Sequence, residues 1–139
     1  MYHRVIIAGY LGRDPEMRYL PDGQPVVNFS VATGRRWTGK DGQAHDETIW
    51  WRVSAFGKTA ELCNQYLTKG RAVLIEGRMR PDENGNPRVW TGQDGAARAS
   101  YEVTADSVRF LGRREEEAPA PVAPEPVIEE PEEPEAIPF

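Results

Sequence analysis

The run from Thr48 to Phe56 constrains the fold of this chain more than any other segment. It reads Thr-Ile-Trp-Trp-Arg-Val-Ser-Ala-Phe, and its β-branched and aromatic residues predict a β-strand. Side chains alternate between the two faces of a strand, so Trp51, Val53 and Ala55 share a face suited to a hydrophobic core. The opposite face carries four residues: Trp50, Arg52, Ser54 and Phe56.

This second face has two interpretations. Two aromatic rings around an arginine suit a nucleic-acid strand, because bases stack on rings and phosphates pair with guanidinium groups. The alternative is an ordinary amphipathic strand with Trp50 half-buried, because exposed aromatic residues have several causes. On this strand alone, the two interpretations have similar weight.

The distribution of charge favours the nucleic-acid interpretation. The net charge is −5, but residues 1–114 hold all 17 Lys and Arg and 13 of the 22 Asp and Glu, a charge of +4. The last 25 residues hold the other nine acids and no base, a charge of −9. A basic body with an acidic end is an asymmetry typical of nucleic-acid-binding proteins.

Cysteine usage and hydropathy limit the class of protein. Cys63 is the only cysteine, so the chain forms no internal disulfide and no cysteine metal cluster. There is no N-terminal apolar run and no apolar stretch of about 18 residues. We therefore expect a soluble, intracellular (cytoplasmic) protein with no membrane contact and no cofactor.

The order of the expected elements predicts the fold. Gly70 is expected to stop the helix, whose apolar stripe pairs Leu62 with Tyr66 and Cys63 with Leu67. The segment Thr38–Asp46 reads as a loop. The elements are strands at 2–11, 25–37 and 48–56, a helix at 58–69, a strand at 72–80, a hairpin at 81–100, and a strand at 101–111 with a bulge near Asp106. Three strands, one helix and two strands predict an all-β fold, the five-stranded OB-fold Greek-key barrel, over residues 1–112.

Composition changes after Gly112. Residues 115–139 contain seven of the 12 prolines, so we expect residues 113–134 to be a disordered Pro/Glu-rich linker. The final segment, 135–139, ends on hydrophobic residues after an acidic run, which is typical of a protein-docking peptide. Its candidate docking residues are Glu135, Ile137, Pro138 and Phe139.

Aromatic and arginine residues interleave on the expected strands and hairpin. Stacking contributes about 1–3 kcal/mol per base and tolerates any base. Reading a duplex would instead favour a groove-entering helix, and the single helix expected here has a core-packing stripe. Trp90 has a second interpretation as a staple of its hairpin, and any one arginine is more often a solvated charge. The candidate DNA contacts are Trp37, Trp50, Phe56, Trp90, Arg35, Arg36, Arg52, Arg78, Arg80 and Arg88.

The residues for catalysis are lacking. His3 and His45 are isolated in the sequence, and Cys63 lies on the helix stripe. Two carboxylate pairs, Asp14 with Glu16 and Asp41 with Asp46, offer ligands for a hard metal, but their loop setting favours turn chemistry. We therefore predict neither an enzyme nor a metal site.

Several motifs together resemble the bacterial single-stranded DNA-binding proteins, over residues 4–111 and the final few positions. They are Val-Ile-Ile-Ala-Gly-Tyr-Leu-Gly-Arg-Asp-Pro-Glu at 5–16, Ser-Val-Ala-Thr at 30–33, Trp-Trp-Arg-Val at 50–53, Phe-Gly-Lys at 56–58, Tyr-Leu-Thr-Lys-Gly at 66–70, Ile-Glu-Gly-Arg at 75–78 and Ile-Pro-Phe at 137–139. The resemblance implies an OB-fold subunit of a homotetramer, with stacking aromatics at Trp37, Trp50, Phe56 and Trp90. It also implies that the tip recruits replication, repair and recombination enzymes. Ala136 departs from the family pattern, which usually has two aspartates before Ile-Pro-Phe.

Two hypotheses of function follow. The first is a non-enzymatic protein that binds single-stranded DNA without sequence preference. The second is an interaction hub, in which the barrel is a scaffold and the tip recruits enzymes. We expect both roles to coexist, and we expect the acidic tail to compete with DNA for the basic body at low salt.

Overall fold

The structure of the chain is a computed structural model, which describes residues 1–113. The expected linker beyond residue 113 and the docking tip at 135–139 lie outside the described residues. The elements are, in chain order, β1 (Val5–Leu11), β2 (Glu16–Tyr19), β3 (Pro25–Thr38), β4 (Ala44–Phe56), α1 (Gly57–Tyr66), β5 (Arg71–Met79), β6 (Val89–Thr91), β7 (Ala97–Ala99) and β8 (Tyr101–Arg113).

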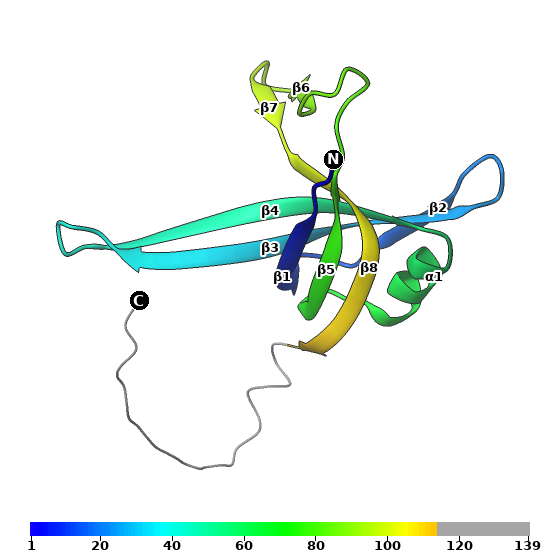
Figure 1. Ribbon diagram of the computed structural model, residues 1–139, viewed down its shortest axis with the longest axis horizontal. Helices are drawn as coiled ribbons and strands as arrows, with labels where there is room; N and C mark the ends of the chain where they lie inside the picture. The colour runs from blue at the N-terminus through cyan, green and yellow to red at the C-terminus, as the bar shows by residue number, and fades with distance from the viewer. Residues whose placement is uncertain (114–139) are drawn as a thin grey trace, which may run out of the picture.

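Five long strands close into a barrel, which confirms the predicted fold. Neighbouring strands pair in the order β1-β5-β8-β4-β3, and β1 also pairs with β3 through Tyr10 with Ala32 and Leu11 with Val31. All of these pairs are antiparallel except β4 with β8. The short β2 adds to the free side of β3. Figure 1 shows the barrel at the centre, with α1 at one side.

The barrel interior is filled by β-branched side chains from every barrel strand. Alternation along β3 directs Val27, Phe29 and Val31 inward, as the sequence predicts. Gly9 lies so close to the carbonyl oxygen of Ala32 that no β-carbon fits there, and this lets β1 cross β3 where the ring closes. The largest fully buried side chains are Ile7, Ile75, Val27, Val31, Val53, Val73, Val103 and Cys63.

The β3–β4 pair extends well beyond the barrel as a two-stranded ribbon (Figure 1). Its pairing is unbroken from Val26 opposite Phe56 to Thr38 opposite Ala44. The prediction of a loop at Thr38–Asp46 was therefore too long. Only the turn around Gly42, whose φ is +81°, interrupts the two strands.

The helix is shorter than the sequence predicts. It ends at Tyr66 because Leu67 turns to extended backbone (ψ 141°) and buries its side chain in the core. Gly70 is therefore not the helix stop; its φ is +87° and its N–H donates to the carbonyl of Leu11. Of the predicted stripe, Cys63 and Leu67 are buried with Ala60, whereas Leu62 and Tyr66 are exposed. At ten residues α1 cannot cross a membrane, and residues 1–113 hold no other helix.

The last two barrel strands confirm one prediction and correct another. The register between β5 and β8 shifts between Glu76 and Gly77, which leaves Asp106 as the extra residue of a bulge. Met79, which the alternation of β5 groups with buried Val73 and Ile75, is instead exposed at the end of the strand. The strand leaves the barrel there, so no second layer covers this side chain.

The predicted hairpin at 81–100 forms a small sheet of its own. Strands β6 and β7 pair only with each other among the described strands, through Trp90 opposite Arg98 and its two neighbouring pairs. Gly85 and Gly95 have φ of +82° and +83°, and their N–H groups close turns on the carbonyls of Asp82 and Gly92. The hairpin stands above the barrel in Figure 1.

Candidate nucleic-acid interface

The outward face of β4 carries the residues that the strand pattern predicts. Trp50 is 53% exposed, Arg52 is exposed and Phe56 is half-buried, whereas Ser54 is buried. The opposing positions on β3 hold only small or polar side chains: Ala32 lies opposite Trp50, Ser30 opposite Arg52, and Asn28 opposite Ser54. The surface beside Arg52 and Ser54 is therefore hollow.

A groove of about 500 Å³ runs over this hollow. Its floor includes Asn28, Ser30 and Ser54. Its lining contains three carboxylates, from Asp14, Glu16 and Glu102, and a larger number of cations. The cations are five arginines: Arg13, Arg18, Arg52, Arg80 and Arg88. The groove therefore has a net positive lining, which suits a polyanion.

Hydrogen bonds hold two of these arginines. The Nη1 of Arg80 donates to the Ser54 hydroxyl at 3.2 Å, and that hydroxyl donates to Oδ1 of Asn28 at 2.7 Å. The Nη1 of Arg88 lies 3.4 Å from Oε2 of Glu102. Both guanidinium groups therefore have fixed partners on the barrel.

Trp90 lies between two of the groove arginines. The guanidinium carbon of Arg52 is 6.0 Å from its ring centroid, and that of Arg88 is 5.8 Å away. The ring is half-buried, so it contacts the groove arginines while part of it stays accessible. The structure thus brings together four of the predicted DNA contacts: Arg52, Arg80, Arg88 and Trp90.

Trp37 lies on the other face of the β3–β4 ribbon from Trp50. The unbroken register groups it with His45, and the two rings stack with centroids 5.3 Å apart. The guanidinium of Arg35 lies 4.4 Å from the Trp37 centroid. His45, which is isolated in the sequence, is thus part of an aromatic stack. The alternation of the sequence predicts the pairing of His45 with Trp37 only if β4 is known to begin at Ala44.

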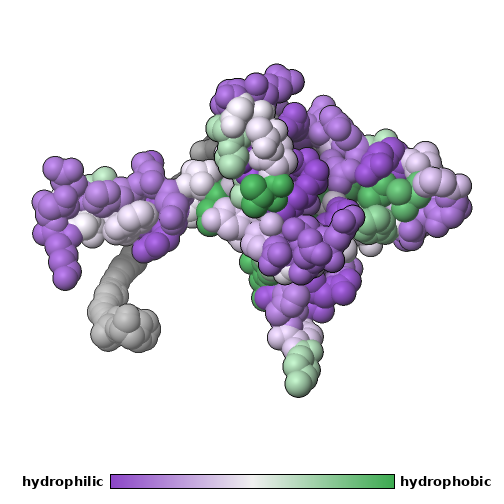
Figure 2. Space-filling model, turned by 90° about the horizontal axis from the view of Figure 1, so that it is seen from above, coloured by the Kyte–Doolittle hydropathy of each residue, from purple (hydrophilic) through white to green (hydrophobic). Residues whose placement is uncertain are grey.

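Charges along the ribbon are paired across its strands. Arg36 contacts Asp46 with Nε and Oδ1 2.7 Å apart, and Arg35 lies 3.7 Å from Glu47. All four side chains are largely exposed. Figure 2 shows that hydrophilic residues dominate the projecting ribbon.

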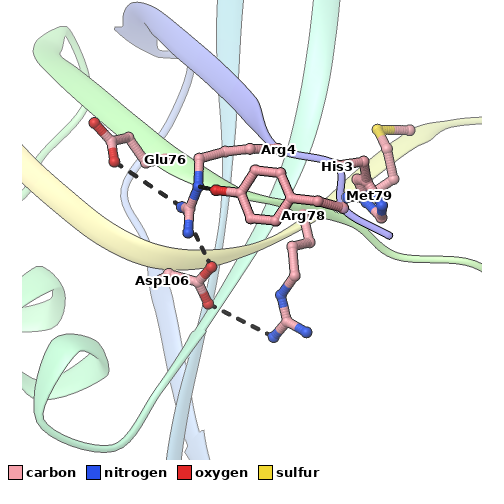
Figure 3. Close-up of polar contacts among 7 residues, drawn as sticks. His3, Arg4, Glu76, Arg78, Met79 and Asp106 are labelled. Carbon is pink, nitrogen blue, oxygen red and sulfur yellow. Dashed lines mark hydrogen bonds and ion pairs between the residues drawn. The ribbon is translucent and has the colours of Figure 1, made fainter.

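Arg78 is separated from the groove. Its Nη2 lies 3.6 Å from Oδ1 of Asp106, whose other oxygen lies 3.5 Å from Nη1 of Arg4. Figure 3 shows this cluster, with Glu76 also beside Arg4. Nearby, Nε2 of His3 accepts a hydrogen bond from the backbone N–H of Met79. The hydrogen bond of Arg4 to the Tyr2 hydroxyl, more than the carboxylates, raises the Arg4 pKa. Arg78 therefore does not join the other predicted contacts.

The remaining candidates behave as turn and core residues. Trp51 packs against the core, as predicted, and its Nε1 donates to Oγ1 of Thr33 at 2.9 Å. Oδ1 of Asp14 accepts the backbone N–H of Lys69, and Oδ1 of Asp41 accepts that of Gln43. These carboxylates hold turns, as the loop setting suggests.

A sequence model described as the Single-strand binding protein family matches residues 2–111. The chain belongs to this family. The match spans β1 to β7 and all but the last two residues of β8, so it confirms the resemblance that the sequence motifs indicate.

Relatives in the family are more than two fifths identical to this chain over the residues that align. The single-stranded DNA-binding protein of Neisseria meningitidis serogroup A is 42% identical over 114 residues, which are 82% of this chain and 62% of the relative. That of Wolinella succinogenes is 44% identical over 111 residues, 80% of this chain and 65% of the relative. The chain thus spans less than two thirds of the length of these relatives.

Solved structures confirm the fold of the family. A Plasmodium falciparum SSB in complex with ssDNA has a TM-score of 0.66 at 23% identity, covering 80% of this chain and 96% of that one. A deletion mutant of the single-stranded DNA binding protein from Thermus aquaticus has a TM-score of 0.62 at 27% identity, covering 80% of this chain and 51% of that one. At the lower identity the likeness concerns the fold alone.

Proposed function

We propose that the chain binds single-stranded DNA without base-sequence preference and performs no catalysis. The observation that carries this proposal is the outward face of β4. There Trp50 presents a half-exposed ring on the same strand face as Arg52, and Arg52 lines the groove together with four other arginines. Membership of the family, whose members in Neisseria and Wolinella are named for single-stranded DNA binding, supports the same function.

The geometry favours unpaired strands over a duplex. Bases of a single strand can turn outward and stack on Trp50, Phe56 and Trp90, while Arg52, Arg80 and Arg88 pair with phosphates. In a duplex the bases are already stacked and present only their edges. The single helix of the described residues is ten residues long, packs Ala60 and Cys63 into the core, and contributes no residue to the lining of the groove.

A strand that continues along the ribbon would meet the second aromatic site. Trp37, with its neighbours Arg35 and Arg36, lies beyond Trp50 towards the ribbon tip. Because Trp37 and Trp50 occupy opposite faces, the bound strand must pass round an edge of the ribbon to use both. Arg78 would then act only on DNA that reaches the far side of the barrel.

Alanine substitution of the rings tests the proposal. Trp50→Ala and Phe56→Ala together should weaken binding to oligo(dT) at least tenfold, because each stacked base contributes about 1–3 kcal/mol. Tyr66→Ala is the matched control, since it removes a half-exposed ring outside the groove. Fluorescence anisotropy with a labelled oligomer measures the affinity, and circular dichroism reports the fold. Equal affinity in the double variant, or tighter binding of a matched duplex by the native chain, would reject the proposal.

The chain is proposed to assemble as a homotetramer. The outer face of β1 exposes Ile6 and Ala8, and the Ile6 side chain is 66% exposed, which is unusual for a hydrophobic residue on a regular strand. The ion pairs of Arg4, Asp106 and Arg78 lie on the adjacent surface (Figure 3). An apolar strip beside fixed charges is suited to a self-complementary contact.

The tip is proposed to recruit replication, repair and recombination proteins in the cytoplasm, at the nucleoid. Glu135, Ile137, Pro138 and Phe139 combine an acidic group with apolar side chains, which suits a basic, apolar pocket on a partner. Deleting residues 135–139 should abolish capture of such enzymes while leaving oligo(dT) affinity intact. Loss of both properties together would contradict separate roles for tip and barrel.

A further inference from the structure

Two polar residues are buried among the described residues, and both line the groove. Ser54 is 6% exposed on β4, and Glu102 is 7% exposed on β8. Burial of a polar group is unfavourable unless hydrogen bonds replace those to water, and burial of a charge is more so. The position of both residues beneath the same groove therefore needs a reason.

Each of the two residues holds an arginine that enters the groove. The Ser54 hydroxyl accepts a hydrogen bond from Nη1 of Arg80 and donates one to Oδ1 of Asn28. These two hydrogen bonds fix the orientation of the hydroxyl. Oε2 of Glu102 accepts the Ser100 hydroxyl at 2.9 Å and lies 3.4 Å from Nη1 of Arg88. Both guanidinium groups are therefore anchored from below.

The main chain connects the two anchors. The backbone N–H of Arg80 donates to the carbonyl of Glu102 at 2.8 Å. Glu102 is also the register partner of Arg52 in the parallel β4–β8 pair, and both residues line the groove. Arg88 leads directly into β6, and its guanidinium lies 5.8 Å from the Trp90 ring centroid. Glu102 thus contacts the arginine that links the separate β6–β7 sheet to the barrel.

Glu102 opposes the simplest electrostatic description of the groove. A carboxylate on the floor of a phosphate-binding groove repels the ligand, so on charge alone its removal should tighten binding. Free arginine side chains, however, lose rotational entropy when they bind, and prior fixation reduces that loss. The two effects have opposite signs, which makes the role of Glu102 measurable.

We infer that Ser54 and Glu102 are positioning residues, which fix Arg80 and Arg88 to meet the phosphates of a single strand. The inference rests on the proposed function and adds to it the residues that aim the cations. Neither positioning residue contacts the nucleic acid itself. Asn28 and Ser100 support them through the hydrogen bonds described.

The deciding variant is Glu102→Gln, measured with labelled oligo(dT) over a range of salt concentrations. It keeps the size of the side chain and removes the charge that holds Arg88. We expect the dissociation constant to rise about fivefold at low salt, and the salt slope to fall by roughly 0.7, the value of one phosphate contact on a single strand. Glu61→Gln is the matched control, because it removes the same charge from an exposed position on α1, outside the groove lining.

A double-mutant cycle separates positioning from stability. In an Arg88→Gln background, Glu102→Gln should have no further effect on the dissociation constant, because the arginine that it positions is gone. A loss that persists in that background, or tighter binding by Glu102→Gln in the native background, overturns the inference. The cycle compares dissociation constants, so a fall in melting temperature that Glu102→Gln causes equally in both backgrounds does not change the result.

Substitutions of Ser54 provide an independent test of the positioning role, which decides the inference if Glu102→Gln does not fold. Ser54→Ala should weaken binding about threefold, and Ser54→Thr, which keeps the hydroxyl, should restore it. Failure of the threonine rescue, with the fold retained, counts against the positioning role. If the native chain itself fails to bind oligo(dT), the proposed function fails; if only these variants behave otherwise, the inference alone fails.

Discussion

The indole ring of Trp50 lies directly against Gly12. A β-carbon at residue 12 would come within 2.5 Å of the ring atom Cζ3, which is closer than two carbon atoms can approach. The absence of a side chain on residue 12 therefore makes room for the ring beside the end of β1. Trp50 is still 53% exposed, which leaves its ring available to a base.

Gly12→Ala should displace the Trp50 ring and weaken oligo(dT) binding. We expect about a tenfold rise in the dissociation constant, equivalent to about 1.4 kcal/mol, which is within the range for one stacked base. Gly34→Ala, on the β3–β4 ribbon, is the control, because a β-carbon there would lie 3.8 Å from its nearest neighbour, the backbone oxygen of Glu47. Equal affinity in the two variants would show that the Gly12 contact does not hold the ring.

Asp46→Asn should increase DNA affinity at low salt. It releases Arg36, whose Nε lies 2.7 Å from Oδ1 of Asp46 on the exposed ribbon. We expect a gain of about twofold to threefold, because exposed ion pairs are weak and the freed cation then pairs with phosphate. The gain should disappear in an Arg36→Gln background and at high salt, where screening removes it. A gain that survives either condition would contradict release of Arg36 as its cause.

Ile6→Glu should reduce the mass of the assembly in solution. A carboxylate on the exposed apolar strip of β1 cannot be buried unpaired against a second copy. Light scattering after size-exclusion chromatography measures the mass. Val89→Glu, a similarly exposed apolar position on β6, is the control. An unchanged mass for Ile6→Glu would place the contact between copies elsewhere.

Stability should fall at high pH because of Cys63. Burial raises the pKa of its thiol from 9.0 to about 12, so the folded state favours the neutral form. The contribution is fully present below pH 9, and it is lost as the pH rises from 9 towards 12 because the unfolded chain then ionises first. Over that interval each pH unit removes about 1.4 kcal/mol from the free energy of unfolding.

Urea denaturation at pH 7 and pH 10 measures this effect. Cys63→Ala should show a smaller loss between the two pH values, because tyrosine and lysine titration is common to both chains. The native thiol should also fail to react with a thiol reagent until urea unfolds the protein, since its exposed fraction is 0%. Rapid reaction in the native state would contradict the burial.

Removal of residues 115–139 should strengthen DNA binding at low salt. That segment carries a charge of −9, and the body through residue 114 carries +4. The acidic segment and the DNA therefore compete for the same cations on the body. The gain should vanish near physiological salt, where the screening length is about 8 Å. A truncated chain with unchanged low-salt affinity would show that the acidic segment does not compete.

Local periodicity was sufficient to predict the core of each barrel strand and, in 48–56, the face that each residue occupies. Alternation in 48–56 assigns Trp50 outward and Trp51 inward, because a pleated strand has a strict period of two. The element order gives the barrel, because few folds place one helix after three strands. The bulge at Asp106 is also visible in sequence, as a break in the same alternation.

Features that depend on distant partners could not be predicted in this way. The helix ends early because Leu67 is drawn into a core made by other strands. The buried carboxylate of Glu102 is paired with Arg88, 14 residues earlier in the chain, and local alternation does not show that pairing. The stack of His45 on Trp37 requires a cross-strand register that the sequence does not show.

The place of β8 in the barrel has a consequence for synthesis of the chain. The last of the described strands to be made lies between β5 and β4, so until it emerges from the ribosome both neighbours have open hydrogen-bonding edges. A nascent chain that stops before residue 101 therefore cannot close the ring. Until β8 emerges, the open edges of β4 and β5 can pair instead with another chain and aggregate.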